Sequence, residues 1–260
     1  MSRNFELLQN LGKEHDMFQA DLEPILEPAP APAPQSAPLP ELEPVPLRLN
    51  MEEGQRDELT RVVQRLFLVP GAEATRAMVM AGSEAGSGCS WVCARMAEIL
   101  ASQVAASVCV VDANFAAPGL HQQFGTENHT GLSDALREQG NIRKFTRQVG
   151  RENLWLLSSG ADSTQWQSLI SSDRMRARVA ELRSEFHYVL IDGPALNTVN
   201  DSVVLGRAAE GVVVVIKANS SRRETARKAV RELESAKVRV LGAILNQRTF
   251  PIPQGIYNKL

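Results

Sequence analysis

One stretch decides the fold of this chain: Ala77-Met-Val-Met-Ala-Gly-Ser-Glu-Ala-Gly-Ser-Gly-Cys-Ser90, which is followed by apolar side chains at helical spacing. The order is that of a buried strand, a glycine-rich loop and a helix. Such a loop binds phosphate, because its backbone N–H groups converge on an anion and the helix N-terminus adds a positive dipole. Gly86 and Gly88 allow the turn, and Ser90 is placed to reach Mg²⁺. We therefore expect a nucleotide phosphate site in this loop.

The loop departs from the consensus G-x-x-x-x-G-K-[ST] at two positions. Ser83 stands at the first glycine, and Cys89 stands where a lysine bridges the β- and γ-phosphates. The sequence has no lysine between Lys13 and Lys144, so no neighbouring lysine replaces it. The sequence thus predicts a phosphate cradle that lacks its usual cation.

Further apolar runs alternate with helical stretches, of which the first spans 57–68. Near-continuous apolar strands are typical of a parallel sheet that is covered by helices on both faces. The chain is therefore predicted to be an α/β protein with a mostly parallel sheet and right-handed crossovers. The predicted strands are Ala77–Ala81, Val108–Val111, Leu154–Leu157, Tyr188–Ile191, Val212–Ile216 and Val238–Leu245.

Acidic side chains end two of these runs. Asp112 follows Val108–Val111, and Asp192 follows Tyr188–Ile191 in the form of a Walker B strand. Ligands of such sheets bind beyond the carboxyl ends of the strands, and carboxylates hold Mg²⁺ directly or through water. Two such acids beside a glycine-rich loop predict a P-loop fold.

Composition limits the class of protein. The 260 residues are 43% apolar and 22% charged, with a net charge of −2, so nothing favours nucleic acid as a partner. Three cysteines in one short window make no disulfide framework, and no apolar run reaches the length of a membrane span. The N-terminus lacks the pattern of a secretory signal. The sequence alone thus predicts a cytoplasmic protein.

The first 50 residues differ from the rest. Nine of the fourteen prolines lie between Pro24 and Pro46, among acidic residues. We expect residues 21–50 to be a disordered acidic linker, because they cannot bury enough apolar surface to fold. Residues 1–20 have the spacing of a short amphipathic helix, which would dock on its own domain or bind a partner. Residues 51–260 are expected to form the P-loop domain.

From Glu58 onward the chain resembles the bacterial tyrosine kinases of capsule and exopolysaccharide synthesis, a P-loop group related to ParA and MinD. The loop carries the first part of this resemblance, and an ordered series of segments carries the rest. These are the Walker A′-like Val111–His121, then Phe124-Gly125, Gly131–Asp134, Leu154–Gly160, Ile191–Pro194 and Val240–Asn246.

The resemblance implies ATP and Mg²⁺ as cofactors and assigns roles to residues. Asp112 and Asp192 would be the catalytic acids and, with Ser90, the magnesium group. Gly86, Ser87 and Gly88 would cradle phosphate together with Cys89 and Ser90, and Asn246 would contact adenine. It also implies a homo-oligomer and a membrane-bound partner of polysaccharide export or chain-length control, which would hold the protein peripheral to the inner membrane.

Several family features are missing. Asn114 replaces the second Walker A′ acid, and Ala116 and Ala117 stand where a basic residue follows. The ring-forming E-x-x-R-x-x-R motif is approximated only by Glu58, Arg61 and Arg65, and the chain's two tyrosines, Tyr188 and Tyr257, make no tyrosine-rich tail. An active kinase and a degenerate regulator thus both stand open. A ParA/MinD-like switch ranks lower, since Glu84 replaces its signature lysine, and a structural adaptor is a further alternative.

Two further expectations concern charge. The helix N-terminus should lower the pKa of the Cys89 thiol. The basic run 222–228 should form a solvated helix face on which Glu224 and Lys228 pair, and a contact with a membrane surface or a partner is the alternative interpretation.

Overall fold

The computed structural model of the chain describes residues 51, 53–68, 75–162, 164–198 and 200–248. The predictions for the segments 1–20 and 21–50, and for Tyr257, therefore lie outside the described residues. No helix in the described ranges has both the length and the hydropathy of a membrane span.

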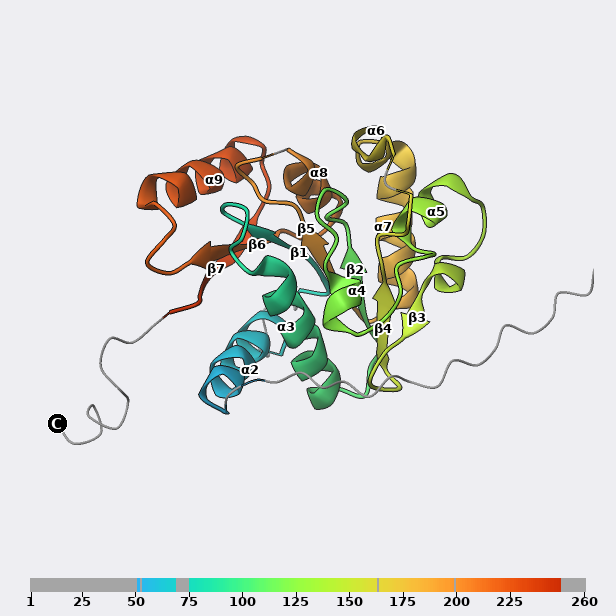
Figure 1. The fold of residues 1–260 in the computed structure, drawn as a ribbon, viewed down its shortest axis with the longest axis horizontal. Helices are drawn as coiled ribbons and strands as arrows, with labels where there is room; N and C mark the ends of the chain where they lie inside the picture. Colours follow the sequence, from blue (N-terminus) through green and yellow to red (C-terminus); the bar gives the residue numbers. More distant parts are fainter. Residues whose placement is uncertain (1–50, 52, 69–74, 163, 199, 249–260) are drawn as a thin grey trace, which may run out of the picture. The chain divides into compact units, whose positions relative to one another are not determined.

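A seven-stranded sheet organises the described part of the chain (Figure 1). Its strand order is β3-β4-β2-β5-β1-β6-β7, and every pair is parallel except β3 with β4. Strands β1 and β2 are buried along their whole length, as their continuous apolar sequences predict. The strands are β1 Ala77–Gly82, β2 Val108–Asp112, β3 Arg147–Gln148, β4 Leu154–Leu157, β5 Tyr188–Gly193, β6 Val212–Lys217 and β7 Val240–Asn246.

Helices cover both faces of the sheet (Figure 1). One apolar cluster joins the strands to α2, α3 and α4, and the other joins them to α5 to α9 on the opposite face. The α/β P-loop architecture predicted above is therefore confirmed. The helices are α2 Glu53–Phe67, α3 Cys89–Gln103, α4 Leu120–Gln123, α5 Leu132–Arg137, the 3₁₀ helix η1 Ile142–Phe145, α6 Trp166–Ile170, α7 Asp173–Glu185, α8 Asp201–Ala208 and α9 Arg223–Ser235.

The predicted elements differ from the observed ones mainly at their ends. The first helix begins at Glu53 rather than at residue 57, and the last strand begins at Val240 rather than at Val238. The sequence did not predict the two-residue edge strand β3, because Arg147 and Gln148 carry no apolar signal.

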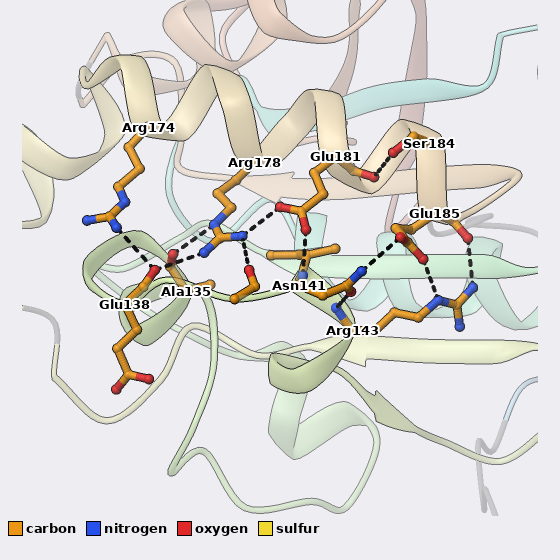
Figure 2. Close-up of polar contacts among 11 residues, drawn as sticks. Ala135, Glu138, Asn141, Arg143, Arg174, Arg178, Glu181, Ser184 and Glu185 are labelled. Carbon is orange, nitrogen blue, oxygen red and sulfur yellow. Dashed lines mark hydrogen bonds and ion pairs between the residues drawn. The ribbon is translucent and has the colours of Figure 1, made fainter.

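An arginine network joins α7 to the segment that follows α5 (Figure 2). The buried Arg178 side chain donates to the carbonyl oxygens of Ala135 at 2.8 Å, Glu138 at 2.9 Å and Gly140 at 2.7 Å. It also contacts Glu181 Oε2 at 2.6 Å. One guanidinium thus binds carbonyl groups of the last turn of α5 and of the segment that follows it, where helix termination leaves carbonyl groups without a helical partner.

The strand order places three chemically distinct ends side by side. Strands β2, β5 and β1 are neighbours, and they end at Asp112, at Asp192-Gly193 and at the glycine-rich loop. Since all three strands are parallel, these ends meet at the same edge of the sheet.

Candidate nucleotide site

The glycine-rich loop runs from Gly82 to the start of α3. Gly86 and Gly88 have φ values of 77° and 78°, in the left-handed region that favours glycine. Gly88 caps α3, and its carbonyl accepts the first helical hydrogen bond from Val92 N at 3.0 Å. The loop therefore has the positive-φ turn that directs backbone N–H groups toward a phosphate.

The loop packs tightly on its own side chains. A Cβ at Gly82 would lie 2.2 Å from Ser87 Oγ, so only glycine fits there. Ser83 N donates to Val215 O at 2.8 Å, which holds the start of the loop against β6. The Ser83 hydroxyl is buried and has no hydrogen-bond partner among the described residues.

Asn246, the last residue of β7, holds the middle of this loop. Its Nδ2 donates to Ser87 O at 2.9 Å, and a Cβ at Gly88 would lie 2.4 Å from the same nitrogen. The residue that the family resemblance assigns to adenine therefore lies at the phosphate loop. Its amide nitrogen is engaged there in a hydrogen bond with the backbone.

An acidic side chain also lies in the loop. Ser221, between β6 and α9, donates from its hydroxyl to Glu84 Oε1 in a short hydrogen bond. The same hydroxyl accepts from Lys217 N at 3.2 Å. Glu84 thus ties the loop to the end of β6 and brings a negative charge where phosphate binding favours a positive one.

Asp112 and Asp192 lie opposite each other on β2 and β5, and both are fully buried. Asp112 accepts three backbone hydrogen bonds, from Asn114 N at 3.2 Å, Gly119 N at 2.9 Å and Leu120 N at 3.0 Å. Burial raises the pKa of Asp112, and these three bonds oppose the rise. Asp112 therefore holds the Walker A′-like loop and the start of α4.

Asp192 has no such support. Neither carboxylate oxygen has a hydrogen-bond partner among the described residues. Burial, together with the charge of Asp112, raises the pKa of Asp192 to about 7, while the nearby Ser90 hydroxyl and Cys89 thiol lower it. A buried carboxylate without partners is costly unless a proton or a cation neutralises it.

The expectation for Cys89 was wrong. Burial, and secondly the charge of Asp192, raises the pKa of the Cys89 thiol well above its ordinary value. The helix N-terminus does not overcome these two effects. Cys89 is therefore a neutral thiol beside a carboxylate, at the position where the consensus has an ammonium group.

The structure brings several predicted site residues together. Ser90 and Cys89 lie near Asp192, and a Cβ at Gly119 would lie 3.6 Å from Ser90 Oγ. The described residues contain no cluster of three His, Cys, Asp or Glu side chains that could hold a metal ion. The arrangement fits a magnesium ion that binds one hydroxyl and one or two carboxylates and takes its remaining ligands from water and phosphate.

The chain is similar to tyrosine-protein kinases of bacteria. Tyrosine-protein kinase YwqD of Bacillus subtilis is 31% identical to the chain over 161 residues, which cover 62% of the chain and 68% of the relative. The chain belongs to the bacterial tyrosine-kinase family. The putative tyrosine-protein kinase CapB of Staphylococcus aureus is 27% identical over 172 residues, 66% of the chain and 75% of the relative.

Solved structures show the same fold. The chimerical protein CapA2B2 aligns with a TM-score of 0.71 at 23% identity, over 76% of the chain and 87% of that protein. Cobyrinic acid a,c-diamide synthase from Mycobacterium smegmatis was solved with an ATP analogue and magnesium bound, and aligns with a TM-score of 0.55 at 19% identity over 67% of the chain and 77% of that enzyme. No protein-family model matches the chain.

Proposed function

We propose that this member of the tyrosine-kinase family is a degenerate regulator of capsule or exopolysaccharide synthesis, which binds Mg²⁺-ATP weakly. One observation carries the proposal: the neutral Cys89 thiol occupies the position of the phosphate-binding lysine. The backbone cradle is retained, so affinity for phosphate is reduced rather than abolished.

Each site residue has a role in this proposal. The backbone N–H groups of Gly86, Ser87 and Gly88 receive the phosphates, and Asn246 positions the loop and offers its amide oxygen to adenine. Ser90 and Asp192 hold Mg²⁺, with Asp112 opposite. The unpartnered oxygens of Asp192 support this assignment, because a bound cation would neutralise them. Magnesium, where bound, would neutralise phosphate charge.

Loss of charge argues against robust kinase activity. Phosphoryl transfer depends on positioning and on electrostatic stabilisation of the transferred group. This chain lacks the P-loop lysine, and Asn114 replaces an acid on the metal side. Glu84 adds a negative charge to the loop itself. The two oxygens of Asp112 already accept three backbone hydrogen bonds, which leaves little capacity for direct metal ligation.

The proposal places the protein in the cytoplasm, peripheral to the inner membrane. Its proposed partner is a membrane-bound polysaccharide export or chain-length component, and self-association is proposed as well. Its membership of the bacterial tyrosine-kinase family supports this, since the resemblance described above implies such a partner. Co-purification of the full chain with a membrane-bound export component from its own cells tests this part.

Isothermal titration of the full chain with ATP tests nucleotide binding. We expect weak affinity that requires Mg²⁺ and disappears in EDTA, because the metal supplies the charge that the lysine would have given. Micromolar or tighter binding that survives EDTA would contradict the proposal. An absence of binding under all conditions would favour a purely structural adaptor.

A further inference from the structure

Charge is unevenly distributed along the chain. Residues 217–239 contain eight basic and three acidic residues, a net charge of +5. The whole chain carries −2, so the remaining residues sum to −7. Such segregation favours an approach to an anionic surface through the basic segment.

The centre of this basic segment is an arginine stripe on α9, defined by Arg223, Arg227 and Arg231. The three residues are exposed and recur every four positions, so they lie along one side of the helix. Ala229 and Leu233 pack into the core on another side. None of the three guanidinium groups forms an ion pair or a hydrogen bond with another described residue.

The predicted ion pair between Glu224 and Lys228 is wrong, and the pair that forms instead does not involve the stripe. Lys228 Nζ lies 3.7 Å from Glu232 Oε1 rather than pairing with Glu224. The ion pair thus uses a lysine beside the stripe and none of its arginines. Three arginines without an ion pair remain along one helix. The exposed Glu224 and Glu234 lie on the same side, three positions from Arg227 and Arg231, so the excess of positive charge comes from the basic segment 217–239 as a whole.

An exposed apolar side chain lies at the same face and edge of the sheet. Leu245 of β7 is 57% exposed, and no other large apolar side chain in the described ranges is comparably exposed. It is in register with Ile216, which packs against the core cluster that contains Ala229 and Leu233 of α9. Leu245 therefore points to the sheet face that α9 covers. It also lies near the carboxyl end of β7, the edge at which α9 begins.

We propose that the arginine stripe of α9, together with Leu245, is a docking surface for an anionic lipid bilayer. Arginine side chains near the surface are attracted to anionic headgroups. An apolar side chain at the same face gains by entering the acyl boundary. The surface binds lipid directly, whether or not nucleotide binds, and so it goes beyond attachment through a membrane-bound partner.

Lipid fits this surface better than duplex nucleic acid or an acidic protein. The exposed Leu245 has no counterpart on a phosphate backbone, whereas a bilayer offers both anionic headgroups and an apolar interior. An acidic protein segment would need matching side chains, whereas a bilayer requires only positive charge beside an exposed apolar side chain. The two alternatives are distinguished by the experiment below.

Vesicle co-sedimentation of the purified full chain tests the proposal. The vesicles are pure phosphatidylcholine, or phosphatidylcholine with about a third of phosphatidylglycerol. We expect binding only to the anionic vesicles, and loss of binding when salt is raised from about 0.1 M to about 0.5 M, because screening shortens the range of the attraction. Arg223→Gln/Arg227→Gln/Arg231→Gln should weaken binding roughly a hundredfold. Leu245→Ser should weaken it about fivefold.

A charge-matched control separates a specific surface from net charge. Arg56→Gln/Lys144→Gln/Arg151→Gln removes the same charge from exposed positions outside α9, one of them on α2 on the opposite face of the sheet. This variant should bind anionic vesicles like the unmodified chain. Equal loss in both triple variants, absence of binding to anionic vesicles, or equal binding to both vesicle types would overturn the proposal. Tighter binding of the unmodified chain to a labelled DNA duplex or to a polyglutamate peptide than to vesicles would overturn the assignment to lipid.

Discussion

Asp112 and Asp192 face each other across the neighbouring strands β2 and β5, both fully buried, yet among the described residues only Asp112 finds hydrogen-bond partners. The three backbone donors of Asp112 stabilise its charged form, whereas Asp192 relies on a proton or a cation. This asymmetry separates a structural acid from an acid that remains available to a ligand.

The first prediction concerns pH. Since the pKa of Asp192 in the folded chain is about 7, against an ordinary 3.8, the folded state binds the proton more tightly. This group's contribution to stability is therefore lost as pH rises from about 4 to about 7. Asp192→Asn should raise the free energy of unfolding by on the order of 2–4 kcal/mol near pH 8 and leave it nearly unchanged near pH 4.

Urea denaturation of the full chain at several pH values measures this effect. Asp57→Asn, at an exposed position on α2, is the control and should change neither stability nor its pH dependence. A variant at Asp192 that is no more stable than the unmodified chain near pH 8 would show that the carboxylate has a partner in solution.

The second prediction concerns the two left-handed glycines. Gly86→Ala adds only backbone strain, because nothing lies within 4 Å of the added Cβ, and should cost about 1 kcal/mol. Gly88→Ala has the same strain and also meets Asn246 Nδ2, so it should cost about 2–3 kcal/mol. The two free energies of unfolding are compared by chemical denaturation.

Adding Asn246→Ala relieves the contact at position 88. In the Gly88→Ala background it should therefore cost less than in the unmodified chain, with a coupling of at least about 1 kcal/mol. Equal costs for the two glycine variants and additive behaviour of Asn246→Ala would mean that Asn246 does not hold the loop.

The third prediction concerns the arginine network of α7. Arg178→Met removes donors from three carbonyl groups and leaves Glu181 without its ion-pair partner, so it should cost about 3–5 kcal/mol. Arg174 also donates to two carbonyl groups, but it is exposed, and Arg174→Met should cost less than about 1 kcal/mol. Thermal unfolding of both variants gives the comparison, and similar losses would disprove the special role of burial.

The fourth prediction concerns catalysis. Cys89→Lys alone restores the phosphate-binding charge but leaves the metal side one carboxylate short. We expect measurable ATP hydrolysis or tyrosine phosphorylation only when Asn114→Asp is added. Turnover by the unmodified chain comparable to that of the double variant would show that the site is not degenerate.

The sheet and its edge could be predicted from the sequence because the signals are local. Apolar runs such as Val108–Val111 mark buried strands, and the glycine spacing around Gly86 marks a turn. The position of Asp112 and Asp192 at one edge then follows from the parallel arrangement alone.

Other features depend on contacts between distant segments. Arg178 has the pattern of a solvated helix residue, but its carbonyl partners lie about 40 positions earlier in the chain. The raised pKa of Cys89 depends on burial and on Asp192, which lies on β5, far along the chain. The local sequence indicates only the helix N-terminus, which would lower the pKa. Similarly, the hydrogen bond from Asn246 to the loop joins positions 159 residues apart.

Calorimetric titration of Mg²⁺-ATP into the unmodified chain and into Cys89→Lys tests the central claim most directly, namely that this loop keeps the shape of a phosphate site and lacks only its charge. The account predicts weak, magnesium-dependent binding to the unmodified chain. It predicts affinity about tenfold to a hundredfold tighter for Cys89→Lys, from one charge-assisted contact of about 1.5–3 kcal/mol. A correctly folded Cys89→Lys variant with no gain in affinity would contradict the account, because it would show that the loop is not shaped for phosphate.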